Sequence, residues 1–295
     1  MTRKIVEYYN NYPLDFIEQA SPLYHYTSFD GFKSIITTGK LRFTNRLFLN
    51  DYSEGAYVLT LCINQADFLF EKDDTFKQRF LEKCNERLAT TGTDPFQFYQ
   101  CSFTTDGDNL PMWNYYAGNG GINLEFNGEI VCDHYAKKCG NKATVFNCGL
   151  IVYEEGKQLK IIKKMILDFW EKSTAENREE VIKLLIKKLM YAGIFFKSKS
   201  YETEKEYRIA FELFSKDGMF NDFQTQYAQY KIDVMYAHGL IVPFVDVLFE
   251  RYALKSLTVP NLVTEKERQA LKLFLMANGY DSVEKIKMSK ITKRF

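Results

Sequence analysis

The sequence predicts a mixed α+β fold, in which short strands and helices alternate around one sheet. Several short segments alternate apolar and polar residues, as half-buried strands do, and Leu23–Thr27 is the first of them. Other segments repeat apolar residues at helical spacing, beginning at Phe29 and Phe32. The sequence contains no internal repeat, low-complexity stretch or proline-rich linker, which indicates a single domain over residues 1–295.

The elements follow from these two periodicities. Residues 3–20 have no clear period, and we expect an extended or short helical arm there. We expect strands at 23–27, 40–44, 98–104, 122–126, 145–153 and 207–214, with one or two more inside 223–236. We expect helices from Ser28 to Gly39, over most of 54–88, briefly after Pro111, as a pair at 157–195, briefly near Val245, and at 264–277. The Lys- and Glu-rich pair at 157–195 is interpreted as a helical insertion packed on the sheet.

Capping residues mark several helix ends. Ser28 offers a hydroxyl to the first turn of its helix, and Gly39 stands where a left-handed C-cap is expected. Thr264 and Glu267 have the spacing of a capping box, and Asn278 with the glycine after it is a stop signal.

The composition excludes some classes of protein. The 39 basic and 38 acidic residues almost cancel, so a broad nucleic-acid-binding surface is not expected. The 25 Phe and 20 Tyr residues favour strands and stacking surfaces. The first residues lack the apolar region of a secretory signal, and no apolar stretch approaches the length of a membrane span. We therefore expect a cytoplasmic protein without a membrane partner.

The six cysteines include no CxxC pair. Free thiols in a reducing compartment are their simplest interpretation. Cys132, His134, Cys139 and Cys148 lie close in sequence, but their spacing matches no familiar zinc motif. No metal is therefore expected.

His25 is the first candidate for chemistry, because it lies on a predicted strand between two tyrosines. A neutral imidazole there could hydrogen-bond a ribose hydroxyl. The alternative is a core histidine bonded to a backbone carbonyl.

An aromatic-rich turn is the second candidate. Trp113, Tyr115 and Tyr116 stand on a short predicted helix, directly before Gly118, Gly120 and Gly121. Aromatic rings beside glycines suit a flat heterocycle, because the backbone can approach it closely. The alternative is ordinary core packing. The glycines form no GxGxxG, and the chain has no Walker sequence.

The third candidate is the acidic start of a strand. Glu204 and Glu206 are two residues apart, which on a strand places both carboxylates on one face. They would repel each other unless a positive or hydrogen-bonding group lay between them, as a sugar hydroxyl could. The alternatives are a solvated strand entry or a structural ion pair between Glu206 and Arg208.

In this order the motifs resemble the bacterial Domain-of-Unknown-Function-2971 family. The similar patterns are His-Tyr-Thr at 25–27, Leu-Asn-Asp-x-x-Glu at 49–54, Ser-Phe at 102–103, Met-Trp-x-x-Tyr at 112–116 with the glycines after it, and Glu-x-Glu-x-Arg at 204–208. A run from Ile286 to Ser289, followed by Arg294, is also similar. The resemblance extends with gaps from Tyr24 to Phe295 and is weakest over 157–195.

That family in turn looks like a distant branch of the ADP-ribosyltransferase-like fold, which has a split mixed or antiparallel sheet with flanking helices. The resemblance implies that His25 holds the ribose of NAD, that Tyr116, or less so Tyr115, stacks near the nicotinamide, and that Glu206 is the catalytic acid. NAD is then a substrate. Further contacts to NAD are implied for Tyr26, Thr27, Ser102, Trp113, Glu204 and Arg208. The strand Cys101–Thr104 departs from the usual patterns, which leaves the role of Ser102 open.

The resemblance implies an NAD-consuming transferase or NAD glycohydrolase, and a toxin or phage-defence effector is one setting for it. The acceptor could be a protein, a nucleic acid or water. Two alternatives stay open. One is a non-catalytic nucleotide- or nucleic-acid-binding module on the same fold. The other is a metal-independent nuclease or other hydrolase that uses His25 with Glu206. The sequence does not specify the oligomeric state.

Overall fold

The chain divides into two compact units. The computed structural model describes residues 12–49, 55–70, 75–90, 97–118, 120–139, 146–213, 231–237, 239–283 and 285–292. The first unit comprises Met1–Ile17, Leu49–Pro95 and Ile151–Tyr201, and the second comprises Glu18–Phe48, Phe96–Leu150 and Glu202–Phe295. Each unit has its own apolar core.

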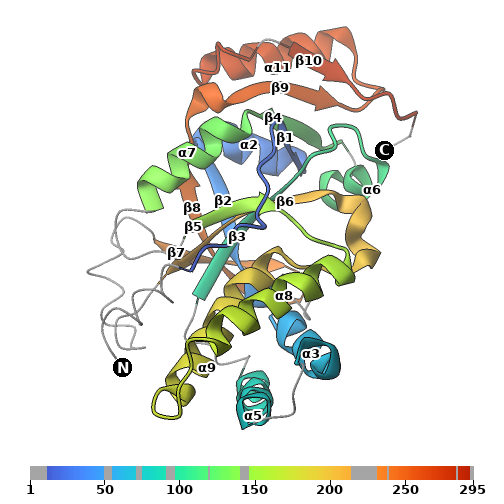
Figure 1. The fold of residues 1–295 in the computed structure, drawn as a ribbon. Coiled ribbons are helices and arrows are strands. Elements are labelled where there is room, and N and C mark those ends of the chain that lie inside the picture. Colours follow the sequence, from blue (N-terminus) through green and yellow to red (C-terminus); the bar gives the residue numbers. More distant parts are fainter. Residues whose placement is uncertain are drawn as a thin grey trace. The chain divides into compact units, whose positions relative to one another are not determined.

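The first unit is helical in its described residues (Figure 1). Its helices are α3 (Tyr57–Asn64), α4 (Ala66–Leu69), α5 (Thr75–Ala89), α8 (Glu155–Trp170) and α9 (Arg178–Ala192). The helix pair expected at 157–195 is confirmed as α8 and α9, and within this unit they pack with α3, α4 and α5. Phe80, Ile162 and Leu185 are fully buried members of their common core.

In the residues that the structure describes, the second unit contains a ten-stranded sheet. Its strands are β1 (Leu23–Thr27), β2 (Lys40–Asn45), β3 (Gln97–Thr104), β4 (Ile122–Phe126), β5 (Phe146–Leu150), β6 (Glu206–Leu213), β7 (Ile232–Ala237), β8 (Leu240–Leu248), β9 (Leu254–Val259) and β10 (Lys285–Met288). Neighbouring strands pair antiparallel except β9 and β10, which are parallel. The predicted α+β class with a mixed, mostly antiparallel sheet is therefore confirmed.

The sheet divides into two branches at β3. Strand β6 pairs with the whole of β3, from Gln97 to Thr104. On the opposite edge, β3 pairs with β1 only at Thr104 and with β2 only at Gln100 and Tyr99. One branch continues as β1-β4-β9-β10 and the other as β2-β8-β7. Ser102 therefore lies between the branches, with no strand opposite it on this edge among the described residues.

Helices cover the apolar side of this sheet. α2 (Phe29–Thr38), α7 (Gly128–Cys139) and α11 (Glu265–Ala277) contribute Phe32, Val131 and Leu275 to one core with the strands. On β3 and β6 the core residues alternate with polar ones, as the period of two requires. Phe103 and Tyr207 belong to the core, so the intervening polar side chains of both strands point to the other face.

The predicted helix ends are confirmed at four positions. Ser28 Oγ accepts a hydrogen bond of 3.1 Å from the Gly31 amide, and Gly39 has a φ of 65°. Thr264 and Glu267 form the expected capping box, and Gly279, with a φ of 77°, follows the end of α11. The short helix after Pro111 is confirmed as α6 (Leu110–Met112), which runs directly into the π-helix η3 (Trp113–Ala117).

The prediction of a short helix near Val245 is wrong. Those residues belong to β8, which pairs with β2 on one side and β7 on the other. The run Leu240–Leu248 is rich in β-branched residues, and Val245 and Val247 enter the core while Asp246 between them bonds Arg42. The strand expected at 145–153 ends at Leu150, and a single parallel bridge joins Val152 to Phe196.

Some expectations lie outside the described residues. They are residues 3–11 of the expected arm, residues 50–54 of the Leu-Asn-Asp-x-x-Glu motif, residues 71–74 of the helical stretch 54–88, and residues 223–230. A strand expected inside 223–236 is present as β7. Within the described part of the chain, no helix has both the length and the apolar character needed to cross a membrane.

Candidate functional site

His25 on β1 packs against Phe103 of β3, with ring centroids 5.5 Å apart. Its Nδ1 lies 3.0 Å from the carbonyl oxygen of Ser102, the β3 residue between the two branches of the sheet. A carbonyl only accepts, so Nδ1 carries the proton and donates it. Burial lowers the pKa of His25, although the bond to Ser102 opposes that shift. The ring is therefore neutral near pH 7, and its Nε2 atom has a lone pair.

Ser102, Glu206 and Arg208 form a hydrogen-bonded cluster on the polar face of β3 and β6. Ser102 Oγ donates to Glu206 Oε1 at 2.6 Å. Arg208 Nε donates to the same oxygen at 2.6 Å, and Arg208 Nη2 donates to Oε2 at 2.9 Å. Glu206 and Arg208 are 4% and 1% exposed, whereas Ser102 is exposed, so the cluster meets solvent at the serine. The bidentate pair holds the carboxylate in one orientation.

Glu204 does not continue this strand face. It ends the 3-10 segment η5 (Lys199–Glu204), and Lys205 has a φ of 45°, in the left-handed region. This turn interrupts the alternation, so the expectation that Glu204 and Glu206 share a strand face is wrong. Glu204 Oε1 instead accepts a hydrogen bond of 3.3 Å from the Tyr116 hydroxyl. Tyr116 thus contacts Glu204, which lies two residues before Glu206 at the start of β6.

The loop after β3 is bonded to the same turn. The Thr105 amide donates to the Lys205 carbonyl at 3.0 Å, and Asn109 Nδ2 donates to the Thr203 carbonyl at 2.9 Å. Lys205 Nζ lies 2.9 Å from Asp106 Oδ2. Partial burial alone would raise the pKa of Asp106, but the lysine and other donors outweigh it and lower that pKa. These contacts fix the start of β6 against the end of β3.

Two residues predicted to contact NAD lie in the core instead. Trp113 is fully buried, and Tyr26 packs edge-on against it with ring centroids 5.0 Å apart. Trp113 Nε1 donates to Asp108 Oδ1 at 2.9 Å, and the Tyr26 hydroxyl donates to the Asp106 carbonyl at 3.0 Å. Their apolar surface and their polar atoms are thus engaged within the protein, which favours the packing interpretation.

The remaining predicted residues differ in access. Tyr115 is 77% exposed and Tyr116 is 38% exposed, so both rings offer a surface to solvent. Both stand on the π-helix η3, an irregularity that is frequent at functional sites. Thr27 ends β1 and is partly buried. Arg208 is engaged with Glu206, as the structural-ion-pair alternative expected.

The glycines after η3 have a structural role at Gly121. A Cβ atom there would lie 2.2 Å from the Ala117 carbonyl oxygen and 2.4 Å from that of Thr27. Only glycine allows this close approach of the turn to the end of β1. The turn places η3 next to β1, on the face of that strand from which Tyr26 contacts Trp113.

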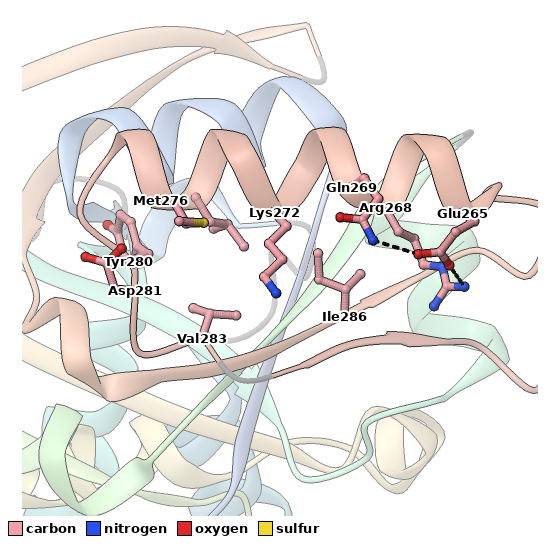
Figure 2. A pocket seen from close by; sticks show the side chains of 10 residues that line it. Glu265, Arg268, Gln269, Lys272, Met276, Tyr280, Asp281, Val283 and Ile286 are labelled. Carbon is pink, nitrogen blue, oxygen red and sulfur yellow. Dashed lines mark hydrogen bonds and ion pairs between the residues drawn. The ribbon is translucent and has the colours of Figure 1, made fainter.

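Two cavities lie along α11, and neither is lined by His25, Ser102 or Glu206. One, of about 350 Å³, opens between α11 and the residues Tyr280, Asp281, Val283 and Ile286 (Figure 2). Its charged residues are partly paired: Glu265 accepts from both Arg268 and Gln269. The other, of about 550 Å³, is mainly apolar and lies between α11 and α2. Over the described residues, no group of three or more His, Cys, Asp or Glu side chains could hold a metal ion.

Comparison with known proteins gives one match. A family model described as "Protein of unknown function (DUF2971)" matches residues 112–209. This segment includes η3, the glycine turn and the Glu204–Arg208 motif, but it excludes His25 and Ser102. No curated protein and no solved structure matches the chain. Nothing in these comparisons connects the chain to ADP-ribosyltransferases.

The sequence interpretation missed two residues that hold the site together. Asp108 accepts bonds from Trp113 Nε1, from Ser289 Oγ at 2.6 Å and from the Lys290 amide at 2.7 Å. Asn109 caps α6 through a bond of 3.2 Å from the Met112 amide. An Asp-Asn pair before Leu-Pro is a helix-cap signal and could have been found. The Ser289 partner, 181 residues away, could not.

Proposed function

We propose that this protein is an NAD-consuming enzyme of the ADP-ribosyltransferase-like type, either a transferase or an NAD glycohydrolase. The observation that carries the proposal is that Ser102 contacts both candidates, His25 through its backbone carbonyl and Glu206 through its hydroxyl. The resemblance implies a histidine on the first strand and a glutamate on a later strand, and it leaves the role of Ser102 on the middle strand open. The position of Ser102 between the two supports a role for it in the same site.

The neutral imidazole suits the ribose-binding role. The proton on Nδ1 is used in the bond to Ser102, which leaves Nε2 as an acceptor for a sugar hydroxyl. The lowered pKa of His25 keeps this lone pair at neutral pH. A cationic imidazolium would lose that acceptor and would repel the positive charge that develops on the sugar.

Glu206 would act on the transition state. Cleavage of the nicotinamide–ribose bond builds oxocarbenium-like charge on the sugar, as glycoside cleavage does. A carboxylate held in place by Ser102 and Arg208 can stabilise that charge without reorganising. Ser102, the exposed member of the cluster, would meet a ribose hydroxyl, and Tyr116 offers its half-exposed ring to the nicotinamide. The acceptor would be a protein, a nucleic acid or water.

One observation favours a second function, a non-catalytic nucleotide-binding module on the same fold. Glu206 is 4% exposed and its charge is matched by Arg208, the arrangement of a structural ion pair. In such a module His25, Ser102 and Tyr116 would bind a nucleotide, and no bond would break. The two functions therefore differ in turnover rather than in binding.

The test is incubation of the protein with NAD and chromatographic measurement of free nicotinamide. We expect release of nicotinamide. Mass spectrometry should then find the ADP-ribose either free, after transfer to water, or attached to an added protein or nucleic acid. His25→Ala should abolish release, and Glu206→Gln should lower it about a hundredfold or more. Saturable NAD binding without release would support the binding module. Absence of both binding and release would refute both functions.

A matched control exists on the same sheet. Glu125 of β4 accepts a 2.6 Å hydrogen bond from Ser256 Oγ and pairs with Lys287, so it repeats the Ser–Glu–cation arrangement elsewhere. Glu125→Gln and Ser256→Ala should leave nicotinamide release unchanged, whereas Ser102→Ala should reduce it. Circular dichroism of each variant would verify folding. Ser102→Ala carries the test if Glu206→Gln fails to fold, because the serine is exposed.

A further inference from the structure

A second cluster of reactive side chains lies on the core side of β6. Cys132 on α7 and Cys148 on β5 are linked by contacts through Tyr207 and Gln19. Cys132 Sγ is 3.0 Å from the hydroxyl of Tyr207, and Cys148 Sγ is 3.6 Å from Gln19 Oε1. Tyr207 donates to the same Gln19 oxygen at 2.5 Å. We call these four residues the dithiol cluster.

The cluster is open to solvent on one side. Cys132 is 8% exposed and Tyr207 is fully buried, but Cys148 is only partly buried and Gln19 is exposed. Gln19 Nε2 also donates to the Cys148 carbonyl at 2.7 Å, which fixes the cysteine backbone. A small oxidant can therefore reach Cys148 first, with Cys132 directly behind it.

The other described cysteines lack these features. Cys62 and Cys84 are fully buried in the helical unit, and Cys101 is 3% exposed in the sheet core. Burial raises the pKa of all three thiols. Interaction with the Cys132 thiol instead lowers the pKa of Cys148, and interaction with Cys148 raises the pKa of Cys132. Thiolates rather than thiols react, so Cys148 is the more nucleophilic member.

We propose that Cys132 and Cys148 form a reversible redox site, in which a hydroperoxide oxidises Cys148 and Cys132 resolves it to a disulfide. The Cys148 thiolate attacks one oxygen of hydrogen peroxide, the O–O bond breaks, and the departing hydroxide is protonated to water. Cys132 then attacks the sulfenic sulfur, the S–O bond breaks, and the hydroxyl leaves as water with the Cys132 proton. Two thiols are oxidised and one peroxide is reduced to two waters.

The first experiment maps the linkage. Fully reduced protein is treated with hydrogen peroxide, blocked with N-ethylmaleimide, and digested without reductant for mass spectrometry. We expect a peptide that links Cys132 to Cys148, removable by dithiothreitol, to form before any product at Cys62 or Cys84. A dominant linkage through Cys139, or oxidation of Cys148 to sulfinic acid with no linkage, would overturn the proposal.

The second experiment assigns the two roles. In Cys132→Ser the sulfenic acid has no resolving thiol, so dimedone should label Cys148. In Cys148→Ser the labelling of Cys132 should be about tenfold slower or more, because a thiol of ordinary or raised pKa is mostly protonated at pH 7. Equal labelling of the two variants would contradict the assignment.

Matched controls separate this site from general thiol oxidation. Cys139→Ser and Cys84→Ser should both leave the Cys132–Cys148 linkage intact. If either serine variant within the dithiol cluster fails to fold, peptide mapping of Cys139→Ser alone decides the linkage. None of these measurements depends on NAD, so the redox site and the proposed function stand or fall separately.

Discussion

The hydroxyl of Ser102 donates a 2.6 Å hydrogen bond to Glu206 Oε1 across the paired strands β3 and β6. The two residues are 104 positions apart in the chain, and their strands run antiparallel with Thr104 opposite Glu206. The contact brings an exposed hydroxyl to a carboxylate that Arg208 holds in a buried ion pair. The backbone carbonyl of the same serine lies 3.0 Å from His25 Nδ1.

Breaking the buried ion pair should cost considerable stability. Glu206→Gln removes the charge of Glu206 from a guanidinium that is 1% exposed, so we expect the free energy of unfolding to fall by about 3–5 kcal/mol. Urea denaturation measures this. Glu125→Gln is the control: its partner Lys287 has a side chain that is 44% exposed, so the loss there should be about 1 kcal/mol or less. Equal losses would mean that the Glu206 pair is not a buried interaction.

The buried imidazole predicts a pH dependence of stability. The pKa of His25 is lower in the folded protein than its unfolded value of about 6.5. Between those two values the unfolded chain binds the extra proton, so the free energy of unfolding falls as pH drops below about 6.5. His25→Asn keeps a donor for the Ser102 carbonyl but does not titrate. The difference in stability between the two proteins should therefore narrow or reverse from pH 7.5 to pH 5, and a constant difference would contradict the assignment.

Substitution by alanine should change the stability of the protein in opposite directions at Gly121 and at Gly156. Gly121→Ala puts a Cβ atom 2.2 Å from the Ala117 carbonyl oxygen, so we expect a loss of about 3 kcal/mol or more. Gly156→Ala lies in the first turn of α8, where the nearest atom is a flexible Glu154 oxygen at 3.6 Å. It should stabilise the protein by about 0.5–1 kcal/mol, because glycine is a poor helix former. Thermal unfolding of both variants tests this contrast.

Substitution of Asp108 should lower the free energy of unfolding more than substitution of its partner Ser289. Asp108→Ala removes the acceptor of Trp113 Nε1, of Ser289 Oγ and of the Lys290 amide, three hydrogen bonds at once, one of them to a fully buried indole. We expect a loss of about 2–3 kcal/mol and a shift of the Trp113 fluorescence, recorded in a Trp170→Phe background. Ser289→Ala removes one of these bonds and should cost about 1 kcal/mol. A larger effect of Ser289→Ala than of Asp108→Ala would contradict the shared-acceptor arrangement.

Short local motifs in the sequence correctly predicted several helix ends. Ser28, Gly39 and the Thr264 capping box lie at the helix ends that their chemistry predicts, because capping depends on bonds within one turn. The segment around Val245 was misassigned, because a short apolar run does not distinguish a helix from a strand with two neighbours. The Lys205 turn was missed because a left-handed lysine has no sequence signal.

By itself, the sequence determined the α+β class, most strands and helices, and the candidates His25, Tyr116 and Glu206. Only the tertiary structure decided which candidates meet. It placed Ser102 in contact with both His25 and Glu206, packed Trp113 and Tyr26 in the core, and paired Glu204 with Tyr116. The physical reason is that these contacts depend on strand register between segments 77 to 104 residues apart. Periodicity specifies which face a residue takes, whereas register specifies its neighbour.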